Sequence, residues 1–417
     1  MNYILQYFNP RLRTIFLLGF ASGLPLALSG STLQAWYTDS GVGITTIGFL
    51  SLVGIPYVFK FLWAPVLDKF IPIKSLGIRR GWIFIAQLFI VLVLLVMAIQ
   101  SPRDTPLLLG VLALSLAFFS ASQDIAFDAY RTDLMKPQER GLGAAFSVTG
   151  YRIAMLVSGG IVWIIADYIS WQISFISMAI LMLFSMLISF RAPQPLYLNQ
   201  KSLTLRQAVT EPFKEFVKRN KQNGILILVF IVVYKLGDAF AGNLSTAFLL
   251  RGINFSLTDI GLVTKTIGLG STLLGVFLGG VFLYKKGLYR SLLWFGILQA
   301  ITNLGFVFLS LVGKNYLVMV SIIALENLAG GMGTAAFVAF LMGLCDHRYS
   351  ATQFALFSAL AAVGRVYVGP LAGYGVEWYG WTNFFGITVL MAIPGLLILL
   401  FLRHDLEIMD TQVPNNE

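Results

Sequence analysis

The sequence predicts an all-α membrane protein whose twelve transmembrane helices form two six-helix bundles. Of its 417 residues, 57% are hydrophobic and only 12% are charged, whereas a soluble domain carries about 25% charged residues. Many segments stay apolar for twenty or more residues, which is enough to cross the hydrocarbon core as a helix. The strands of membrane barrels are about half that length and alternate in polarity, so a barrel is excluded.

The apolar runs define the expected spans and the domain boundaries. The spans lie near 14–38, 44–66, 81–99, 107–134, 141–166, 171–190, 224–250, 257–283, 289–312, 316–345, 351–377 and 381–402. The longest polar stretch, 191–223, is a basic cytoplasmic linker that is expected to form an amphipathic surface helix. It separates an N-terminal bundle (1–190) from a C-terminal bundle (224–403), which a cytoplasmic tail (404–417) follows.

The distribution of basic residues orients the helices. With the N-terminus inside, the outward loops contain only three basic residues, Arg103, Arg251 and Lys314. The inward loops hold many more, and Lys and Arg concentrate in cytoplasmic loops of membrane proteins. Both termini are therefore expected in the cytoplasm. The net charge of +10 follows from the same rule, so it does not indicate binding of nucleic acid.

The two halves look like repeats. The fifth spans contain AAFSVTGYR (144–152) and ALFSALAAVGR (355–365), and each string ends in Gly plus Arg. A basic loop follows the second span of each half. Twelve spans with this symmetry resemble the major facilitator superfamily, whose usual loop pattern is G-x-x-x-D-R/K-x-G-R/K-R/K.

The loop match is degenerate but stands at the expected place in both halves. Ala64 replaces the first glycine, an insertion divides the first motif, and Tyr284 replaces the acid in the second half. The resemblance implies two bundles that rock about a site near the membrane midplane. The gate-forming loop residues would be Asp68, Lys69, Arg79, Arg80, Lys285 and Arg290.

Nine ionisable residues fall within the expected spans. Each costs about 2.5–3.5 kcal/mol at a helix centre on insertion scales, and such residues normally face the bundle interior or a water-filled cavity. A single one is as often a structural charge pair as a functional group, but nine across both halves indicate a polar transport cavity. They are Lys60, Asp124, Asp128, Arg152, Lys235, Asp238, Lys265, Glu326 and Arg365.

The stretch ASQDIAFDAYRTDL (121–134) places two acids and a base on one helix face, because residues three and four apart are neighbours. Burial favours the protonated form of a carboxyl, and a nearby arginine favours the charged form. An acid that exchanges its proton and its basic partner during transport would couple the two flows. The proton-coupling candidates are Asp124, Asp128 and Glu326; for Glu326 the alternative is a structural hydrogen bond with Asn327.

Arginines in corresponding helices indicate an anionic substrate. Arg152 and Arg365 end the repeated strings, and a guanidinium binds a carboxylate with two parallel hydrogen bonds. Lys235 and Asp238, three residues apart, are expected to form a local ion pair. The predicted substrate-binding set is Lys60, Gln123, Arg152, Lys235, Asp238, Lys265 and Arg365.

Longer strings give a narrower resemblance. GFASGLPLALSGSTLQAW (19–36), VFKFLWAPVLDK (58–69), ASQDIAFDAYRTD (121–133) and ENLAGGMGTAAFVAFLM (326–342) are similar to the AmpG muropeptide permeases. That resemblance implies an inner-membrane permease that imports anhydromuropeptides for peptidoglycan recycling, powered by the proton motive force, and whose cargo can signal β-lactamase induction. Some members continue into extra C-terminal hydrophobic segments; this chain stops after the twelfth span.

Several alternatives stay open. The nearest are carriers with a related core, for acetyl-CoA or for sugars and peptides with protons; a lipid flippase or substrate sensor is another. An enzyme is not expected, because His347 and His404 lie at helix ends and no nucleophile–base set is present. One cysteine excludes a Cys-rich metal site. We expect no cofactor beyond the coupling proton, and a monomer in the lipid bilayer.

Overall fold

The computed structural model of the protein describes residues 10–135, 140–195, 211–219, 223–345 and 350–411. The parts of the linker and tail at 196–210, 220–222 and 412–417 lie outside the described residues. Within these ranges every regular element is a helix, as expected where the bilayer offers no hydrogen-bond partner to an exposed backbone. Contacts divide the chain into two compact units, 1–42 with 53–204 and 43–52 with 205–417.

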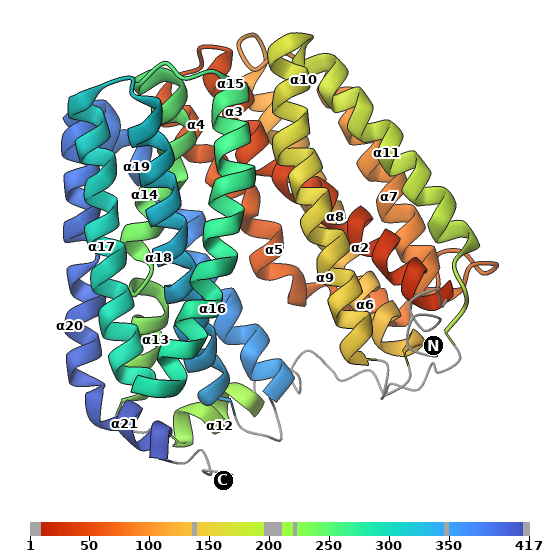
Figure 1. Cartoon of the computed structure of the whole chain (residues 1–417). Helices are drawn as coiled ribbons and strands as arrows, with labels where there is room; N and C mark the ends of the chain where they lie inside the picture. The colour runs from red at the N-terminus through yellow and green to blue at the C-terminus, as the bar shows by residue number, and fades with distance from the viewer. Residues whose placement is uncertain (1–9, 136–139, 196–210, 220–222, 346–349, 412–417) are drawn as a thin grey trace, which may run out of the picture. The chain divides into compact units, whose positions relative to one another are not determined.

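The first unit is a helical bundle (Figure 1). Its helices are α2 (Pro10–Ser29), α3 (Ser31–Asp39), α5 (Ile55–Phe59), α6 (Ala64–Lys69), α7 (Gly77–Ala98), α8 (Pro106–Leu134), α9 (Arg140–Leu156), α10 (Val162–Tyr168) and α11 (Trp171–Arg191). Ser170 caps the N-terminus of α11: its side chain accepts a hydrogen bond from Ile173 N at 3.2 Å, and serine is a common residue at this position.

The second unit is also a helical bundle. Its helices are α4 (Ile44–Phe49), α12 (Glu211–Arg219), α13 (Gly224–Val233), α14 (Leu236–Ala247), α15 (Leu257–Leu262), α16 (Leu269–Lys286), α17 (Leu288–Val312), α18 (Tyr316–Gly343), α19 (Ser350–Leu390), α20 (Ile393–Phe401) and α21 (Arg403–Thr411). The short helices α12 and α21 lie at the same end of this unit (Figure 1). Phe216 of α12 is fully buried in its core.

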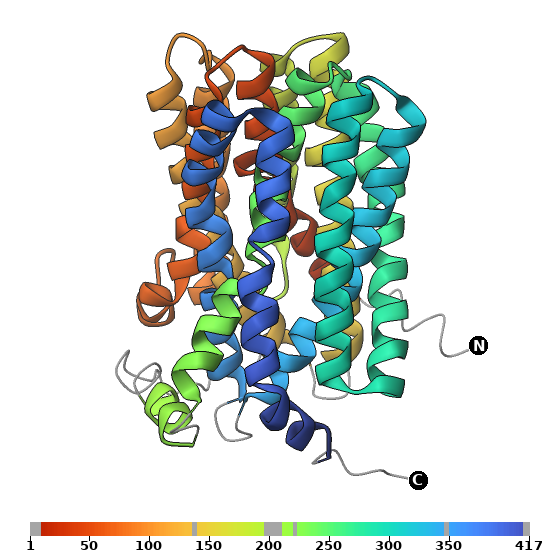
Figure 2. The ribbon, with the colours of Figure 1, turned by 90° about the vertical axis from the view of Figure 1, so that its left-hand side faces the viewer.

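Eleven helical runs among the described residues are long and apolar enough to cross a membrane, where the sequence predicts twelve. The difference lies in one run, Leu356–Phe401, which is 46 residues long. Its helix is interrupted at Gly380, where φ is 72°, a conformation that glycine adopts without steric cost. Figure 2 shows the chain reversing between two neighbouring blue helices. The predicted spans 351–377 and 381–402 lie on either side of this glycine, and the cytoplasmic placement of the termini stays a prediction.

Small residues allow the closest helix contacts inside each unit. A Cβ on Gly19 of α2 would lie 2.6 Å from Ser147 O of α9, and one on Gly23 would lie 2.5 Å from Tyr151 O. In the second unit, a Cβ on Gly275 of α16 would meet Leu328 O of α18. Glycines four apart bring helix backbones together in this way in membranes.

Gly275→Val is expected to destabilise the protein by about 1–3 kcal/mol, because the new side chain overpacks the contact between α16 and α18. The matched control is Gly280→Val on the same helix, since nothing lies within 4 Å of a Cβ built at Gly280. Thermal unfolding of both variants in detergent measures the difference. Equal unfolding temperatures would contradict the close packing at Gly275.

Candidate functional site

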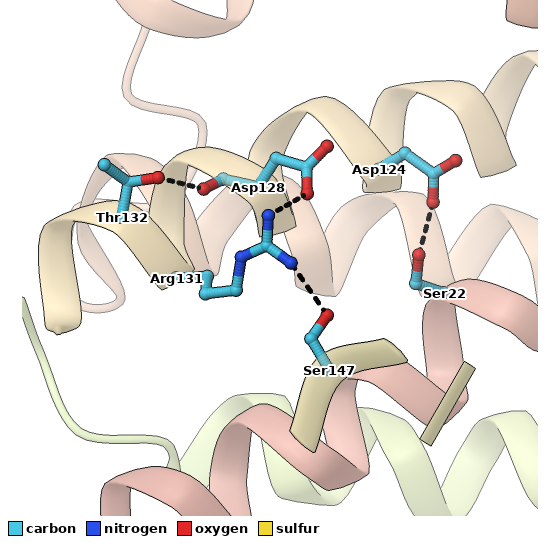
Figure 3. Close-up of polar contacts among 6 residues, drawn as sticks. All are labelled: Ser22, Asp124, Asp128, Arg131, Thr132 and Ser147. Atoms are coloured by element: carbon cyan, nitrogen blue, oxygen red, sulfur yellow. Dashed lines mark hydrogen bonds and ion pairs between the residues drawn. The ribbon is translucent and has the colours of Figure 1, made fainter. Parts of the chain in front are cut away.

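The first unit holds a polar cluster on the face of α8 that the sequence singles out (Figure 3). Ser22 Oγ of α2 donates a hydrogen bond of 2.5 Å to Asp124 Oδ1. One turn further, Asp128 Oδ1 pairs with Arg131 at 3.2 Å, and Arg131 Nη1 donates to Ser147 Oγ of α9 at 3.0 Å. The two acids therefore differ: Asp124 is held by a neutral hydroxyl and Asp128 by a guanidinium.

Asp124 lies in a polar environment built from several helices. The charges that act on its carboxyl are those of Lys60 and Asp128. The charge of Asp124 also acts electrostatically on the hydroxyl groups of Tyr57 and Tyr151. A single carboxyl with one hydroxyl donor and one nearby cation can hold or release a proton without dismantling a network of ion pairs.

The second unit holds a separate cluster. Lys235 Nζ donates to Thr334 Oγ1 of α18 at 2.8 Å. Lys235 lies in the turn between α13 and α14, where the helix is interrupted. The charges of Asp238, Glu326 and Arg365 all act on Lys235, and the predicted local ion pair of Lys235 with Asp238 stays a prediction.

Glu326 has the neighbour that the sequence suggests. Asn327 Nδ2 donates to Glu326 Oε2 at 2.9 Å, and Thr272 Oγ1 of α16 donates to Asn327 Oδ1 at 3.0 Å. Both Lys235 and Asp238 act electrostatically on the Glu326 carboxyl. Glu326 therefore has a hydrogen-bond donor beside it, as the structural alternative requires, together with the acid and base that a proton-coupling role requires.

All three predicted intramembrane lysines stand where the helix is irregular. Lys60 begins a short 3-10 segment, Lys60–Leu62. Lys235 lies in the turn before α14, and Lys265 lies in a π-helical segment, Val263–Gly268. Irregular backbone at membrane depth occurs where the chain is buried in protein or lines a water-filled cavity, and π-segments are frequent at functional sites. The irregular helical segments therefore coincide with the three lysines that the charge pattern singled out.

The remaining predicted binding residues differ in exposure. The side chains of Arg152 and Arg365 are exposed, so each can reach a bound anion. Gln123 is only 1% exposed, and neither of its amide atoms has a hydrogen-bond partner within the described ranges. In this conformation Gln123 presents no surface to a substrate.

One of the predicted gating residues forms an ion pair with a neighbouring helix. Arg79 Nε binds Asp133 Oδ2 of α8 at 3.0 Å, and the two side chains are about one-tenth exposed. Arg80 donates to Leu76 O at 3.1 Å and to Ala192 O at the end of α11. Lys69, Lys285 and Arg290 are exposed, and the side chain of Asp68 lies outside the described residues. Arg79 and Arg80 thus tie α7 to two neighbouring helices.

Five hydroxyl residues of these clusters were not predicted: Ser22, Tyr57, Ser147, Thr272 and Thr334. Each is small or amphipathic, and neither composition nor hydropathy separates it from other residues of its helix. The signal for Ser22 is its place between Gly19 and Gly23, where the close contact of α2 with α9 begins. No group of three or more potential metal ligands occurs in the described part of the chain.

Cys345, the only cysteine, is a probe of the end of α18. Burial raises the pKa of the Cys345 thiol, and Arg219 partly offsets this effect; Arg219 Nη2 also donates to the neighbouring Leu344 O at 2.5 Å. Because the thiolate is the reactive form, we expect maleimide labelling to be slow at pH 7 and to rise only at alkaline pH.

The Arg219→Gln variant sharpens this test. Removal of the cation should move the labelling midpoint to still higher pH, whereas the unfolded protein should label with the midpoint of a free thiol, near pH 8.5. Stopped labelling at a series of pH values measures all three midpoints. A native midpoint at or below that of the unfolded chain would contradict the half-buried position of Cys345.

Membrane-spanning helical bundles with charged clusters inside the spans define a polytopic membrane transporter. Comparison with known proteins gives the family. Residues 15–366 match the model of the Major Facilitator Superfamily, and the chain is 48% identical over 407 residues to the "Anhydromuropeptide permease" of Escherichia coli K12, covering 97% of this chain and 82% of that protein. The chain therefore belongs to the major facilitator superfamily and, within it, to the family of that permease.

Two further similarities agree with this family assignment. The chain is 33% identical over 407 residues to "Putative transporter AmpG 4" of Rickettsia felis, with 95% and 98% of the two chains covered. The crystal structure of the nucleoside transporter NupG has the same fold, with a TM-score of 0.72 at 15% identity over 94% of this chain and 99% of that one. The protein is thus a multi-pass transporter of the bacterial inner membrane, and not an enzyme.

Proposed function

We propose that this protein imports anhydromuropeptides from the periplasm to the cytoplasm by alternating access, driven by the proton motive force. The substrates would be N-acetylglucosaminyl-1,6-anhydro-N-acetylmuramic acid, with or without a stem peptide, and the route would serve peptidoglycan recycling. The observation that carries the proposal is the 48% identity, over 97% of the chain, to a protein named as an anhydromuropeptide permease.

The chemistry of the two clusters supports an anionic, sugar-rich substrate. Arg152 and Arg365 have exposed side chains, and a guanidinium matches the planar geometry of a carboxylate. Lys60, Lys235 and Lys265 add positive charge. The carboxylates of a muropeptide would then pair with arginine, while the sugar hydroxyls would accept and donate hydrogen bonds along polar side chains.

Proton coupling rests on acids that stand within the spans. Asp124 with its Ser22 donor and Glu326 with its Asn327 donor each occupy a different unit. A proton bound at one of these carboxyls would accompany the substrate inward and leave on the cytoplasmic side. The proton is then the sole coupling ion, with no cofactor, and one chain would suffice as the transporting unit.

Uptake into liposomes tests the substrate. We expect radiolabelled N-acetylglucosaminyl-anhydromuramyl peptide to accumulate under an imposed inward proton gradient, and unlabelled muropeptide to compete with it. Acetyl-CoA, free sugars and free peptides should not compete at equal concentration. Competition by acetyl-CoA or by a sugar alone would instead identify a related carrier, and binding without accumulation would identify a sensor.

A further inference from the structure

A groove on the second unit shares no lining residue with the two charged clusters. It has a volume of about 510 Å³ and lies among helices α16, α17 and α18. Its lining combines two cations with apolar side chains: Phe282, Lys286, Arg290, Trp294, Phe295, Leu298 and Met332.

The groove carries two positive charges close together. Lys286 ends α16, Arg290 lies in the first turn of α17, and the connecting Gly287 adopts φ 78°. Both basic side chains are exposed, and none of the other residues that line the groove is acidic. These two cations therefore favour an anionic ligand.

The rest of the groove lining is apolar. Arg290, Trp294 and Leu298 are four residues apart, so they form one stripe along α17. Trp294 is 59% exposed, and on the neighbouring α16 Phe277 is 67% exposed. In a membrane-spanning helix such exposed apolar side chains face acyl chains, and tryptophan prefers the level of the lipid headgroups.

We propose that this groove binds one anionic phospholipid. Its phosphate pairs with Lys286 and Arg290, and an acyl chain lies along Trp294 and Leu298. Basic pockets between transmembrane helices on the cytoplasmic side bind anionic headgroups, and the basic loops predict that this end of α16 lies on the cytoplasmic side. Five of the seven lining residues are apolar, which matches a lipid and not a free phosphate ion. This role is additional to the gating predicted for Arg290.

Quenching of Trp294 by brominated lipids tests the proposal. The difference in fluorescence between the reconstituted protein and its Trp294→Phe variant isolates this residue from the other seven tryptophans. Brominated phosphatidylglycerol should quench the Trp294 signal at a mole fraction about thirtyfold lower than brominated phosphatidylcholine, as expected for two cations near the membrane surface. No preference between the two lipids would overturn the proposal.

Charge variants locate the headgroup. Lys286→Gln combined with Arg290→Gln should abolish the preference, and each single variant should reduce it about fivefold. Lys285→Gln is the matched control, because this adjacent exposed lysine does not line the groove, and it should retain the preference. A preference that survives the double variant, that is lost in the control, or that inorganic phosphate abolishes in the native protein would refute a lipid site at Lys286 and Arg290.

Discussion

Asp124→Asn is expected to abolish proton-driven accumulation of muropeptide while leaving substrate binding intact. Asparagine keeps the size of the side chain and can still accept the hydrogen bond of Ser22, but it cannot bind and release a proton. If one proton enters with each substrate, a gradient of one pH unit supports about tenfold accumulation. In liposomes the variant should reach a ratio of about one, and muropeptide should still exchange between the two sides.

Two controls separate coupling from folding. Ser22→Ala removes the donor that holds Asp124 but keeps the carboxyl, so accumulation should persist with an altered dependence on pH. Asp104→Asn changes an exposed loop acid and should behave as the native protein. Undiminished gradient-driven accumulation by Asp124→Asn would exclude this residue as the proton carrier.

Arg365→Gln is expected to weaken binding of carboxylate-bearing muropeptides by about 10–100-fold, the effect of losing a hydrogen bond to a charged group worth about 1.5–3 kcal/mol. Arg152→Gln should act in the same direction, because its side chain is also exposed. The same variants should lose much less affinity for an analogue whose carboxyl groups are amidated. Equilibrium binding of both ligands to the purified variants measures the difference.

The matched control for these variants is Arg103→Gln, which removes an exposed arginine from a loop between two spans. It should bind both ligands as the native protein does. Equal losses for the charged and the amidated ligand in Arg365→Gln would assign the arginine a structural role.

The helical spans could be predicted because hydropathy and length are the properties that the bilayer itself selects. The predicted span 107–134 corresponds to α8, Pro106–Leu134, and the predicted span 316–345 to α18, Tyr316–Gly343. The boundary predicted between 377 and 381 coincides with the break at Gly380. The packing of residues 43–52 with the second unit has no such signal, because it depends on contacts with distant helices.

The charged residues of the site could be predicted, but most of their distant partners could not. Charged residues within an apolar run are conspicuous, so Asp124, Lys235 and Glu326 stand out, and the adjacent Asn327 was expected beside Glu326. The hydrogen-bond partners of Asp124 and Lys235 are ordinary hydroxyl residues: Ser22 lies 102 positions from Asp124, and Thr334 lies 99 positions from Lys235. Only the folded chain brings these pairs together.

The surroundings of Lys235 could be predicted only in part. A spacing of three residues brings side chains together on a continuous helix, and the charge of Asp238 does act on Lys235. The helix is interrupted at Tyr234 and Lys235, and the amine of Lys235 also reaches Thr334 on α18. A helix break inside an apolar run leaves no mark in the hydropathy.

The most direct test of coupled import follows protons instead of substrate. Proteoliposomes with a pH-sensitive dye inside receive external N-acetylglucosaminyl-anhydromuramyl peptide, with no proton gradient imposed and the membrane potential clamped. If import is proton-coupled, the lumen should acidify as muropeptide enters, and Asp124→Asn vesicles should show no acidification. Entry of muropeptide into native vesicles without any change in internal pH would contradict proton-coupled import.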